Sequence, residues 1–215
     1  YYSINSNGIW FSSEIRALIE LLGEAPKMDL QVVHDYLALG QVDQSPRTFF
    51  DGIQTFPAAS YVEIPLNGAI AFREPKPYWK AELGEGDGMS IQDASKNLRE
   101  SFLNNISLHM RSDVPVGSCL SGGIDSSSIV CSMRELSPDA EIHTFSYIAR
   151  ATSLSEEKWV DVINKHTSSI SHKVYGTGED MATELDQLIL TQGEPFGSSS
   201  IYAQNKVFQA AKRQG

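Results

Sequence analysis

The chain has 215 residues, with 17 Lys and Arg against 27 Asp and Glu, so its formal net charge is −10. This acidity, without any basic cluster, argues against nucleic acid or an anionic membrane as the main partner. Two cysteines are too few for a disulfide framework, and no apolar run reaches the ~20 residues that span a bilayer. We therefore expect a cytoplasmic protein that acts on small molecules.

Residues 1–80 predict a small unit of hairpins and short helices. Residues 1–11 alternate around a turn at 5–8, which indicates a hairpin. Helices are expected at 15–22 and 29–40, because apolar residues recur at helical spacing before Gly23 and Gly40. A second hairpin is predicted across Asn67-Gly68, the dipeptide that favours such turns most strongly.

Residues 74–88 predict a boundary between two domains. Two prolines stiffen the start of this stretch, and a glycine-rich acidic run follows. We place the linker at 81–89, with Tyr78-Trp79 pinning it onto a domain. The chain starts without Met and stops where a helix would pass to a strand, so we expect a piece of a longer protein.

Residues 90–215 predict alternating helices and strands. A long helix starts at the capping pair Ser90 and Asp93, with its apolar residues on one face. Further strands are expected at 142–148 and 170–175, and helices at 156–166 and around 181–189. Alternation predicts a parallel sheet with right-handed crossovers, which binds ligands beyond the carboxyl ends of its strands.

The segment 114–130, VPVGSCLSGGIDSSSIV, carries the strongest functional signal. Val114, Val116 and Leu120 predict a buried strand over 114–120. This strand, a glycine-rich turn and a helix start present N–H groups and a positive helix end to an anion. Asp125 would repel a bare phosphate, so we predict that it holds Mg²⁺, which in turn holds the phosphates. A glycine–serine turn without a ligand is the alternative.

The SGGxDS pattern after an apolar strand resembles the pyrophosphate loop of the N-type ATP pyrophosphatases. These enzymes cleave ATP between its α- and β-phosphates. The loop differs from the Walker pattern, because no Gly-Lys-Ser/Thr follows the glycines, and it lacks the third glycine of the dinucleotide fingerprint.

A wider set of segments is similar to the glutamine-dependent asparagine synthetases. They follow the order of that family over nearly the whole chain: FSSEIRAL (11–18), YLALG (36–40), YW (78–79), LR (98–99), RSDVPVG (111–117), LSGGIDSS (120–127), TFS (144–146) and GEPFGSSS (193–200).

The resemblance implies an α/β protein of two parts. Residues 1–80 would be the end of an N-terminal-nucleophile α+β glutaminase domain. Residues 90–215 would begin a parallel-sheet ATP pyrophosphatase domain of the adenine nucleotide alpha hydrolase type. The implied enzyme adenylates the side chain of aspartate with MgATP, and ammonia from glutamine then gives asparagine. A homodimer is compatible with it.

The resemblance also implies roles for single residues. The ATP phosphates would be held by a loop of five residues: Ser121, Gly122, Gly123, Asp125 and Ser126. Asp125 would be the catalytic and metal-binding residue, while Leu120 and Tyr147 would flank the adenosine. Glu194 would lie near the substrate aspartate. Gly193 and Ser198 stand where the family usually has acids, which leaves the acceptor open.

The glutaminase nucleophile is absent from these residues, and Cys119 does not replace it, since we expect it to be a small buried hydrophobe. Alone, the chain is therefore expected not to make asparagine. Related cyclases that close β-lactam rings or lasso peptides are the nearest alternative. Pyrophosphatases of tRNA thiolation or sulfate-nucleotide reduction are another, and an inactive structural fragment is the third.

Overall fold

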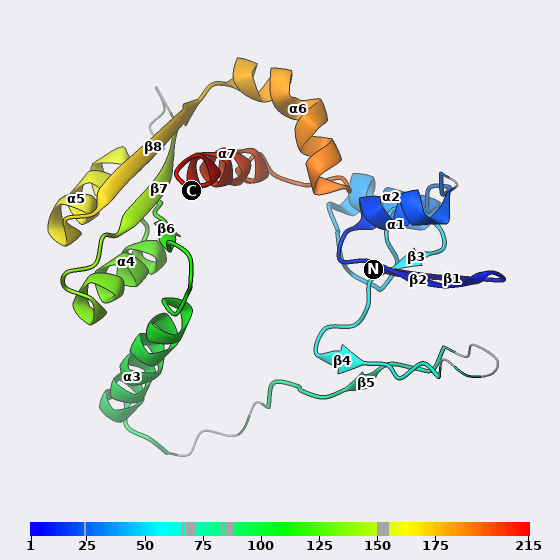
Figure 1. Cartoon of the computed structure of the whole chain (residues 1–215), viewed down its shortest axis with the longest axis horizontal. Coiled ribbons are helices and arrows are strands. Elements are labelled where there is room, and N and C mark those ends of the chain that lie inside the picture. The colour runs from blue at the N-terminus through cyan, green and yellow to red at the C-terminus, as the bar shows by residue number, and fades with distance from the viewer. Residues whose placement is uncertain (24, 66, 68–71, 83, 85–87, 150–154) are drawn as a thin grey trace. The chain divides into compact units, whose positions relative to one another are not determined.

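The computed structural model describes residues 1–23, 25–65, 67, 72–82, 84, 88–149 and 155–215. The chain divides into two compact units (Figure 1). The first comprises Tyr1–Glu85 and Ile189–Gly197, and the second comprises Gly86–Leu188 and Ser198–Gly215.

The first unit is built on a three-stranded antiparallel sheet. Strands β1 (Tyr2–Asn5) and β2 (Gly8–Phe11) form the predicted hairpin, and β3 (Ile53–Gln54) pairs with the other edge of β1. Helix α1 (Ile15–Leu22) buries Ile15 and Leu18 against Ile53, which makes the core of this unit.

Both predicted helices of the first unit are confirmed, and so are their ends. Helix α1 ends at Gly23 and α2 (Leu30–Leu39) ends at Gly40, each glycine with a positive φ. At the start of α2, the Asp29 carboxylate accepts hydrogen bonds from the backbone N–H groups of Gln31 and Val32. Such side-chain caps satisfy donors that have no partner inside the helix.

The flanks of the second predicted hairpin are present as short strands. Strand β4 (Ser60–Tyr61) pairs antiparallel with β5 (Lys76–Pro77), with Tyr61 opposite Lys76. The turn predicted at Asn67-Gly68 lies largely outside the described residues, as does much of the linker predicted at 81–89.

The second unit contains the predicted parallel sheet. Strands β6 (Gly117–Cys119), β7 (His143–Ala149) and β8 (Ile170–Gly176) are neighbours in that order, and both pairings are parallel. Because Cys119 pairs with Phe145, and Ala149 with Gly176, the carboxyl ends of the strands meet at one edge of the sheet. Segments that follow these strands therefore lie along that edge.

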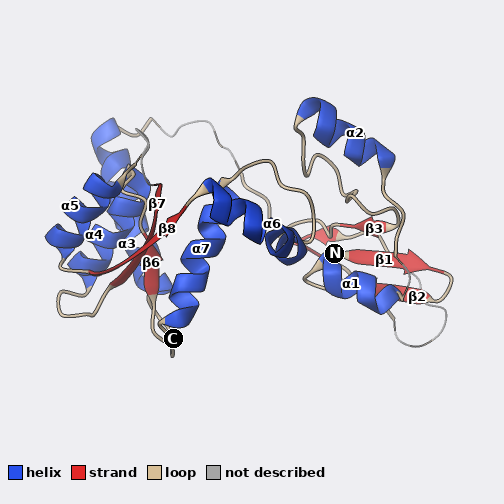
Figure 2. Cartoon of the chain, turned by 90° about the horizontal axis from the view of Figure 1, so that it is seen from above, coloured by secondary structure: helices blue, strands red, loops and turns tan. Residues whose placement is uncertain are grey.

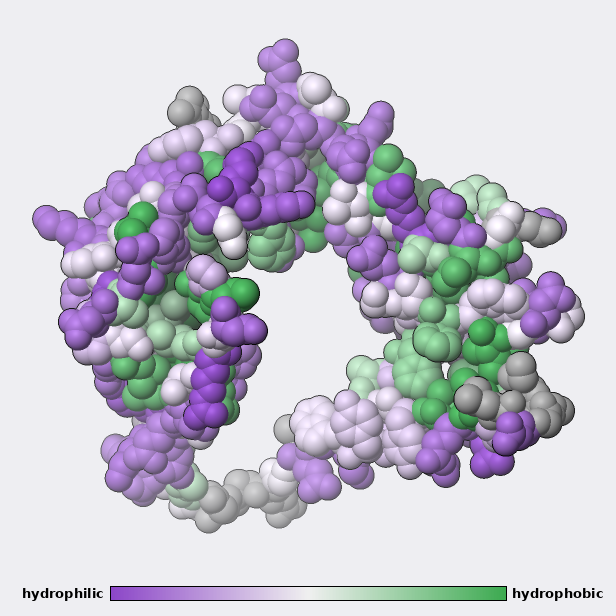
Figure 3. Space-filling view, in the orientation of Figure 1, coloured by the Kyte–Doolittle hydropathy of each residue, from purple (hydrophilic) through white to green (hydrophobic). Residues whose placement is uncertain are grey.

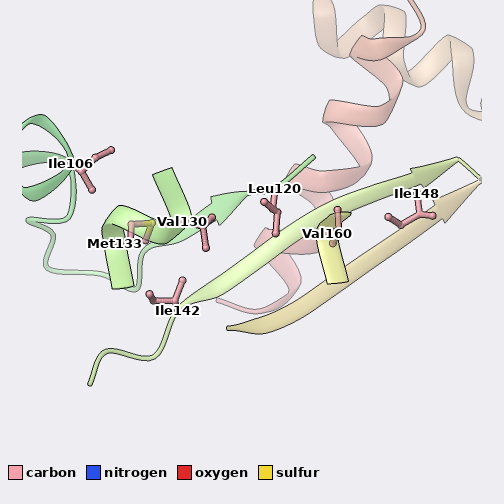
Figure 4. Packing of buried hydrophobic residues seen from close by; sticks show 7 residues of the cluster. All are labelled: Ile106, Leu120, Val130, Met133, Ile142, Ile148 and Val160. Atoms are coloured by element: carbon pink, nitrogen blue, oxygen red, sulfur yellow. The ribbon is translucent and has the colours of Figure 1, made fainter. Parts of the chain in front are cut away.

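Helices cover both faces of this sheet (Figure 2). They are α3 (Ile91–His109), α4 (Ile124–Leu136), α5 (Glu157–Thr167) and α7 (Ser200–Arg213), while α6 (Gly178–Gln192) follows β8 and leads away from the sheet. Helices α3, α4 and α5 lie on one side, where seven buried residues form the main core (Figure 4). Helix α7 lies on the other side and buries Val207 and Ala210 against Phe145. Within the described part of the chain, no helix is long and apolar enough to cross a membrane.

Two predictions about burial are wrong. The strand expected at 114–120 has only three residues, Val114 is 64% exposed, and Cys119 is exposed rather than buried. Successive side chains of an extended segment point to opposite faces of the sheet, so Leu120 is covered by the core while Cys119 points to the other face. The predicted long helix is present as α3, and Ile106 is its buried residue, while Leu98 on the same apolar face is 70% exposed.

Arg134 joins the carboxyl ends of α4 and α5. Its guanidinium donates to the backbone carbonyls of Thr167 (2.7 Å), Pro138 (2.6 Å) and Ala140 (2.8 Å). Arg134→Met would leave these carbonyls without their donor, and we expect the free energy of unfolding to fall by about 2–3 kcal/mol. Urea denaturation measures this change. Arg99→Met, which breaks an exposed ion pair with Glu135, is the control and should cost under ~0.5 kcal/mol.

Candidate functional site

The loop between β6 and α4 is held closed by two serines. The Ser126 hydroxyl oxygen lies 3.2 Å from the backbone N of Ser121, which donates to it, and 3.1 Å from the Ser121 hydroxyl oxygen. The Gly123 N–H donates to the Ser121 hydroxyl at 3.3 Å. These bonds fix the loop geometry before any ligand arrives.

The start of α4 is open to a ligand. Gly123 is its N-cap residue, and no side chain makes a capping hydrogen bond there. The N–H groups of residues 124–126, in the first turn, have no acceptor within the helix. Together with the positive end of the helix dipole, they form a site suited to an anion.

The two loop glycines have different surroundings. Gly122 has φ +85°, and a Cβ there would lie 2.8 Å from Trp159 Cβ and 3.1 Å from the backbone N of Val160. Packing against α5 therefore requires this glycine. Gly123 has φ −70°, and a Cβ there would meet only the Ser121 hydroxyl, at 3.4 Å. The fold thus leaves room at Gly123, beside the open helix end.

Asp125 is exposed in the first turn of α4 and lines a groove of about 680 Å³ between α3 and α4. Figure 3 shows hydrophobic side chains gathered over these two helices. Among the described residues, no three or more His, Cys, Asp or Glu side chains gather to hold a metal. An ion at Asp125 would therefore also need ligand oxygens, an arrangement that Mg²⁺ commonly adopts with phosphates.

Tyr147 lines a separate pocket of about 620 Å³ at the carboxyl ends of β7 and β8. The start of α6 and the start of α7 form its other walls, with Thr177, the three serines 198–200 and Tyr202. The Tyr202 hydroxyl is buried and has no hydrogen-bond partner among the residues that the structure describes, and burial raises the pKa of this phenol. A buried hydroxyl without a partner is unusual, and it marks this wall as a place where a ligand group could bind.

Leu120 contributes to packing more than to either cavity. Its side chain is 1% exposed and belongs to the main core, and its N–H donates to the Phe145 carbonyl at 2.9 Å. The expectation that Leu120 flanks an adenosine stays a prediction.

Glu194 belongs to the first unit. One of its carboxylate oxygens accepts from the Phe49 N–H at 3.1 Å, and the other accepts from the Tyr1 hydroxyl at 3.2 Å. The predicted contact of Glu194 with a substrate stays a prediction.

Of the predicted site residues, the five loop residues lie together in one turn, but Asp125 and Tyr147 line different cavities.

Sequence reasoning missed the pocket wall formed by Thr177 and Tyr202. Neither residue belongs to a recognisable motif, and only the fold brings them to Tyr147. The serines at 198–200 could have been found, because a run of serines before a helical pattern is a typical helix start.

A histidine pair lies across β7 and β8. The Nδ1 of His143 is 2.8 Å from the Nε2 of His172, and the His143 Nε2 is 2.7 Å from the Glu141 carboxylate. Burial, followed by the charge of His143, keeps the pKa of His172 below its ordinary value.

This arrangement predicts acid sensitivity. A base whose pKa is lowered by folding stabilises the protein above its unfolded pKa of about 6.5, and that stability is lost as the pH falls toward the folded pKa. We expect His172→Gln to flatten the decrease in unfolding free energy between about pH 7.5 and 5.5. Urea denaturation at several pH values in this range measures the unfolding free energy. If its dependence on pH is the same in His172→Gln, His172 is not the source of the acid sensitivity.

Comparison with known proteins gives a consistent family for both units. Residues 97–215 match the asparagine synthase family, and residues 1–79 match the glutamine amidotransferase domain. A putative glutamine-hydrolyzing asparagine synthetase 2 of Methanocaldococcus jannaschii is 29% identical over 218 residues, covering 99% of this chain and 41% of that protein. Asparagine synthetase 1 of Bacillus subtilis is 29% identical over 217 residues, covering 99% of this chain and 32% of its own length. An amidase of Gibberella zeae is 30% identical over 132 residues, which are 60% of this chain and 18% of that protein. The chain thus spans about two fifths and one third of the two synthetases.

Proposed function

The chain belongs to the asparagine synthase family, and on this premise we propose that it forms part of a glutamine-hydrolysing asparagine synthetase. The protein would join the side-chain carboxylate of aspartate to ammonia, with cleavage of ATP between its α- and β-phosphates. Residues 90–215 would begin the N-type ATP pyrophosphatase domain, 81–89 the linker, and residues 1–80 would come from the glutaminase domain. The names of two relatives that the chain matches over 99% of its length support this proposal.

The main support for the proposal is the N-terminus of α4, which has no side-chain cap and directly follows a loop held in shape by its own hydrogen bonds. The N–H groups of residues 124–126 would bind the phosphate oxygens, and the two loop hydroxyls would add donors. Because the loop is already closed by the serine pair, little reorganisation is needed on binding. Asp125 would hold Mg²⁺, which supplies charge neutralisation for the phosphates when bound.

The pocket at Tyr147 is proposed to take the rest of the bound substrates. Its position at the carboxyl ends of parallel strands is the usual ligand position in such sheets. Three serines and Tyr147 are among its lining residues, and these residue types can offer hydrogen bonds together with an aromatic surface. We propose that the adenosine lies against Tyr147.

ATP–pyrophosphate exchange tests this function. The protein, expressed from its complete gene, is given ATP, Mg²⁺, aspartate and labelled pyrophosphate. Aspartate-dependent transfer of label into ATP is the expected result, because adenylation of a carboxylate is reversible. Exchange driven only by another carboxylic acid would favour a cyclase of the same family, and exchange with none of them would contradict the proposal.

Tyr202→Phe tests the pocket. Removing a buried hydroxyl that has no partner in the described part of the chain should change the free energy of unfolding by less than ~1 kcal/mol, in either direction. If the hydroxyl bonds to a bound substrate, the KM for ATP or aspartate rises about three- to tenfold. Steady-state exchange kinetics measures the KM, and unchanged values for both substrates would remove Tyr202 from the site.

A further inference from the structure

One wall of the Tyr147 pocket carries a phenol that is held in place. All the described residues that line this pocket belong to the second unit. Tyr202, in the first turn of α7, is 2% exposed, and its ring meets the Tyr147 ring at 80°, with 6.2 Å between the centroids. The ammonium group of Lys206 lies 5.8 Å from the centroid of the Tyr202 ring and pairs with the Glu184 carboxylate. Packing therefore fixes the direction of the Tyr202 hydroxyl before a ligand binds.

The Tyr202 hydroxyl differs from two other hydroxyl groups of the same pocket. The Thr177 hydroxyl donates to the Asp180 carboxylate and accepts from the Asp180 N–H, and the Ser198 hydroxyl accepts from the Ser200 N–H at 3.2 Å. The Tyr202 hydroxyl is buried and has no such partner in the described part of the chain. A phenol can donate one hydrogen bond and also accept one, so a hydroxyl group of a ligand would satisfy it.

The character of the pocket favours a neutral ligand. No charged side chain is among the described residues that line it. An amino acid would have to bring its ammonium and carboxylate groups into this pocket, which is costly without charged partners, whereas a nucleoside is neutral. The aromatic ring of Tyr147 suits a flat base, and the hydroxyl-bearing side chains suit the part of a nucleoside that carries hydroxyl groups, the sugar.

We propose that the Tyr202 hydroxyl binds a hydroxyl group of the ribose and makes this pocket selective for ribonucleotides over deoxyribonucleotides. The inference rests on the proposed function, which places the adenosine against Tyr147, and it deepens that function by assigning the sugar to the start of α7. A buried polar group that pairs with a substrate hydroxyl discriminates against the analogue without this hydroxyl, because the protein group is then left without a partner. Burial raises the pKa of the Tyr202 phenol, which therefore stays protonated and able to donate at neutral pH.

Equilibrium titration of the whole chain with ATP, 2′-deoxy-ATP and 3′-deoxy-ATP, each with Mg²⁺, tests the proposal. The unchanged protein should bind ATP at least about tenfold more tightly than one of the two deoxy analogues. In Tyr202→Phe this preference should fall below about twofold. Tyr175→Phe is the matched control: it removes a phenol hydroxyl that donates to Glu157 and does not line the pocket, so the preference should remain. Because each preference is a ratio measured within one variant, a partial loss of folded protein cannot imitate the result.

The possible outcomes separate this inference from the proposed function. Equal affinities for ATP and both analogues in the unchanged protein, or a preference that survives in Tyr202→Phe, would overturn the role of Tyr202. Aspartate-dependent exchange by the protein from the complete gene would still support the synthetase function in that case. A preference that is lost in Tyr202→Phe would support the sugar site even if aspartate drives no exchange. Absence of any ATP binding would overturn both.

Discussion

Asp125→Asn is expected to reduce ATP–pyrophosphate exchange at least ~100-fold while leaving the protein folded. The amide keeps the size of the side chain but loses the charge that would hold Mg²⁺. Loss of an acidic group from the first turn of α4 costs about 0.3–1 kcal/mol of stability, which is too little to explain such a loss of rate. Exchange kinetics together with urea denaturation measures both effects.

Asp113→Asn is the matched control for this experiment. Asp113 is also an exposed carboxylate and lies in the loop before β6, so its removal changes the net charge by the same amount. It should keep exchange within about twofold of the unchanged protein. Exchange at the original rate in Asp125→Asn would contradict the assignment of this residue to the metal.

Replacing each of the two loop glycines by alanine is expected to affect different properties: stability at Gly122 and ATP affinity at Gly123. Gly122→Ala combines a left-handed backbone with contacts of 2.8 and 3.1 Å to α5, so the free energy of unfolding should fall by about 3 kcal/mol. Gly123→Ala meets no such contact, and its stability should stay within ~0.5 kcal/mol. The added methyl group would nevertheless stand where phosphate must approach the backbone, so ATP affinity should fall at least about tenfold.

Thermal or urea denaturation and an equilibrium titration with ATP separate the two variants. Each serves as the control of the other, because both add one methyl group to neighbouring positions of the same loop. Normal ATP affinity in Gly123→Ala would place the phosphates elsewhere, even if Gly122→Ala behaves as expected.

Most of the fold could be predicted from the sequence, because its signals are local. The caps at Asp29 and Ser90, and the glycines that end α1 and α2, set helix limits through backbone chemistry alone. Alternation of strands and helices was enough for the parallel sheet. Burial was harder to predict: Cys119 and Val114 are apolar, but both are exposed, because burial depends on which elements pack against a side chain and not on its own type.

The candidate site could be predicted where it is continuous in sequence and not where it is assembled by the fold. The loop at 121–126 carries its own geometry, including the serine pair. The wall around Tyr202 depends on contacts of α7 with β7 and β8 that have no sequence signature. The hydrogen bonds of Glu194 could not be predicted either, because its donors Tyr1 and Phe49 lie 193 and 145 residues away along the chain.

The most direct test of the central claim is an NMR titration of the protein with ATP, in the presence and absence of Mg²⁺, followed at the backbone amides. The loop is proposed to bind phosphate through the N–H groups of residues 124–126. These amides and that of Gly123 should therefore show the largest shifts, the Tyr147 amide should shift with them, and Mg²⁺ should tighten binding only while Asp125 is present. Saturable ATP binding that leaves the amides of residues 123–126 unmoved would contradict the claim.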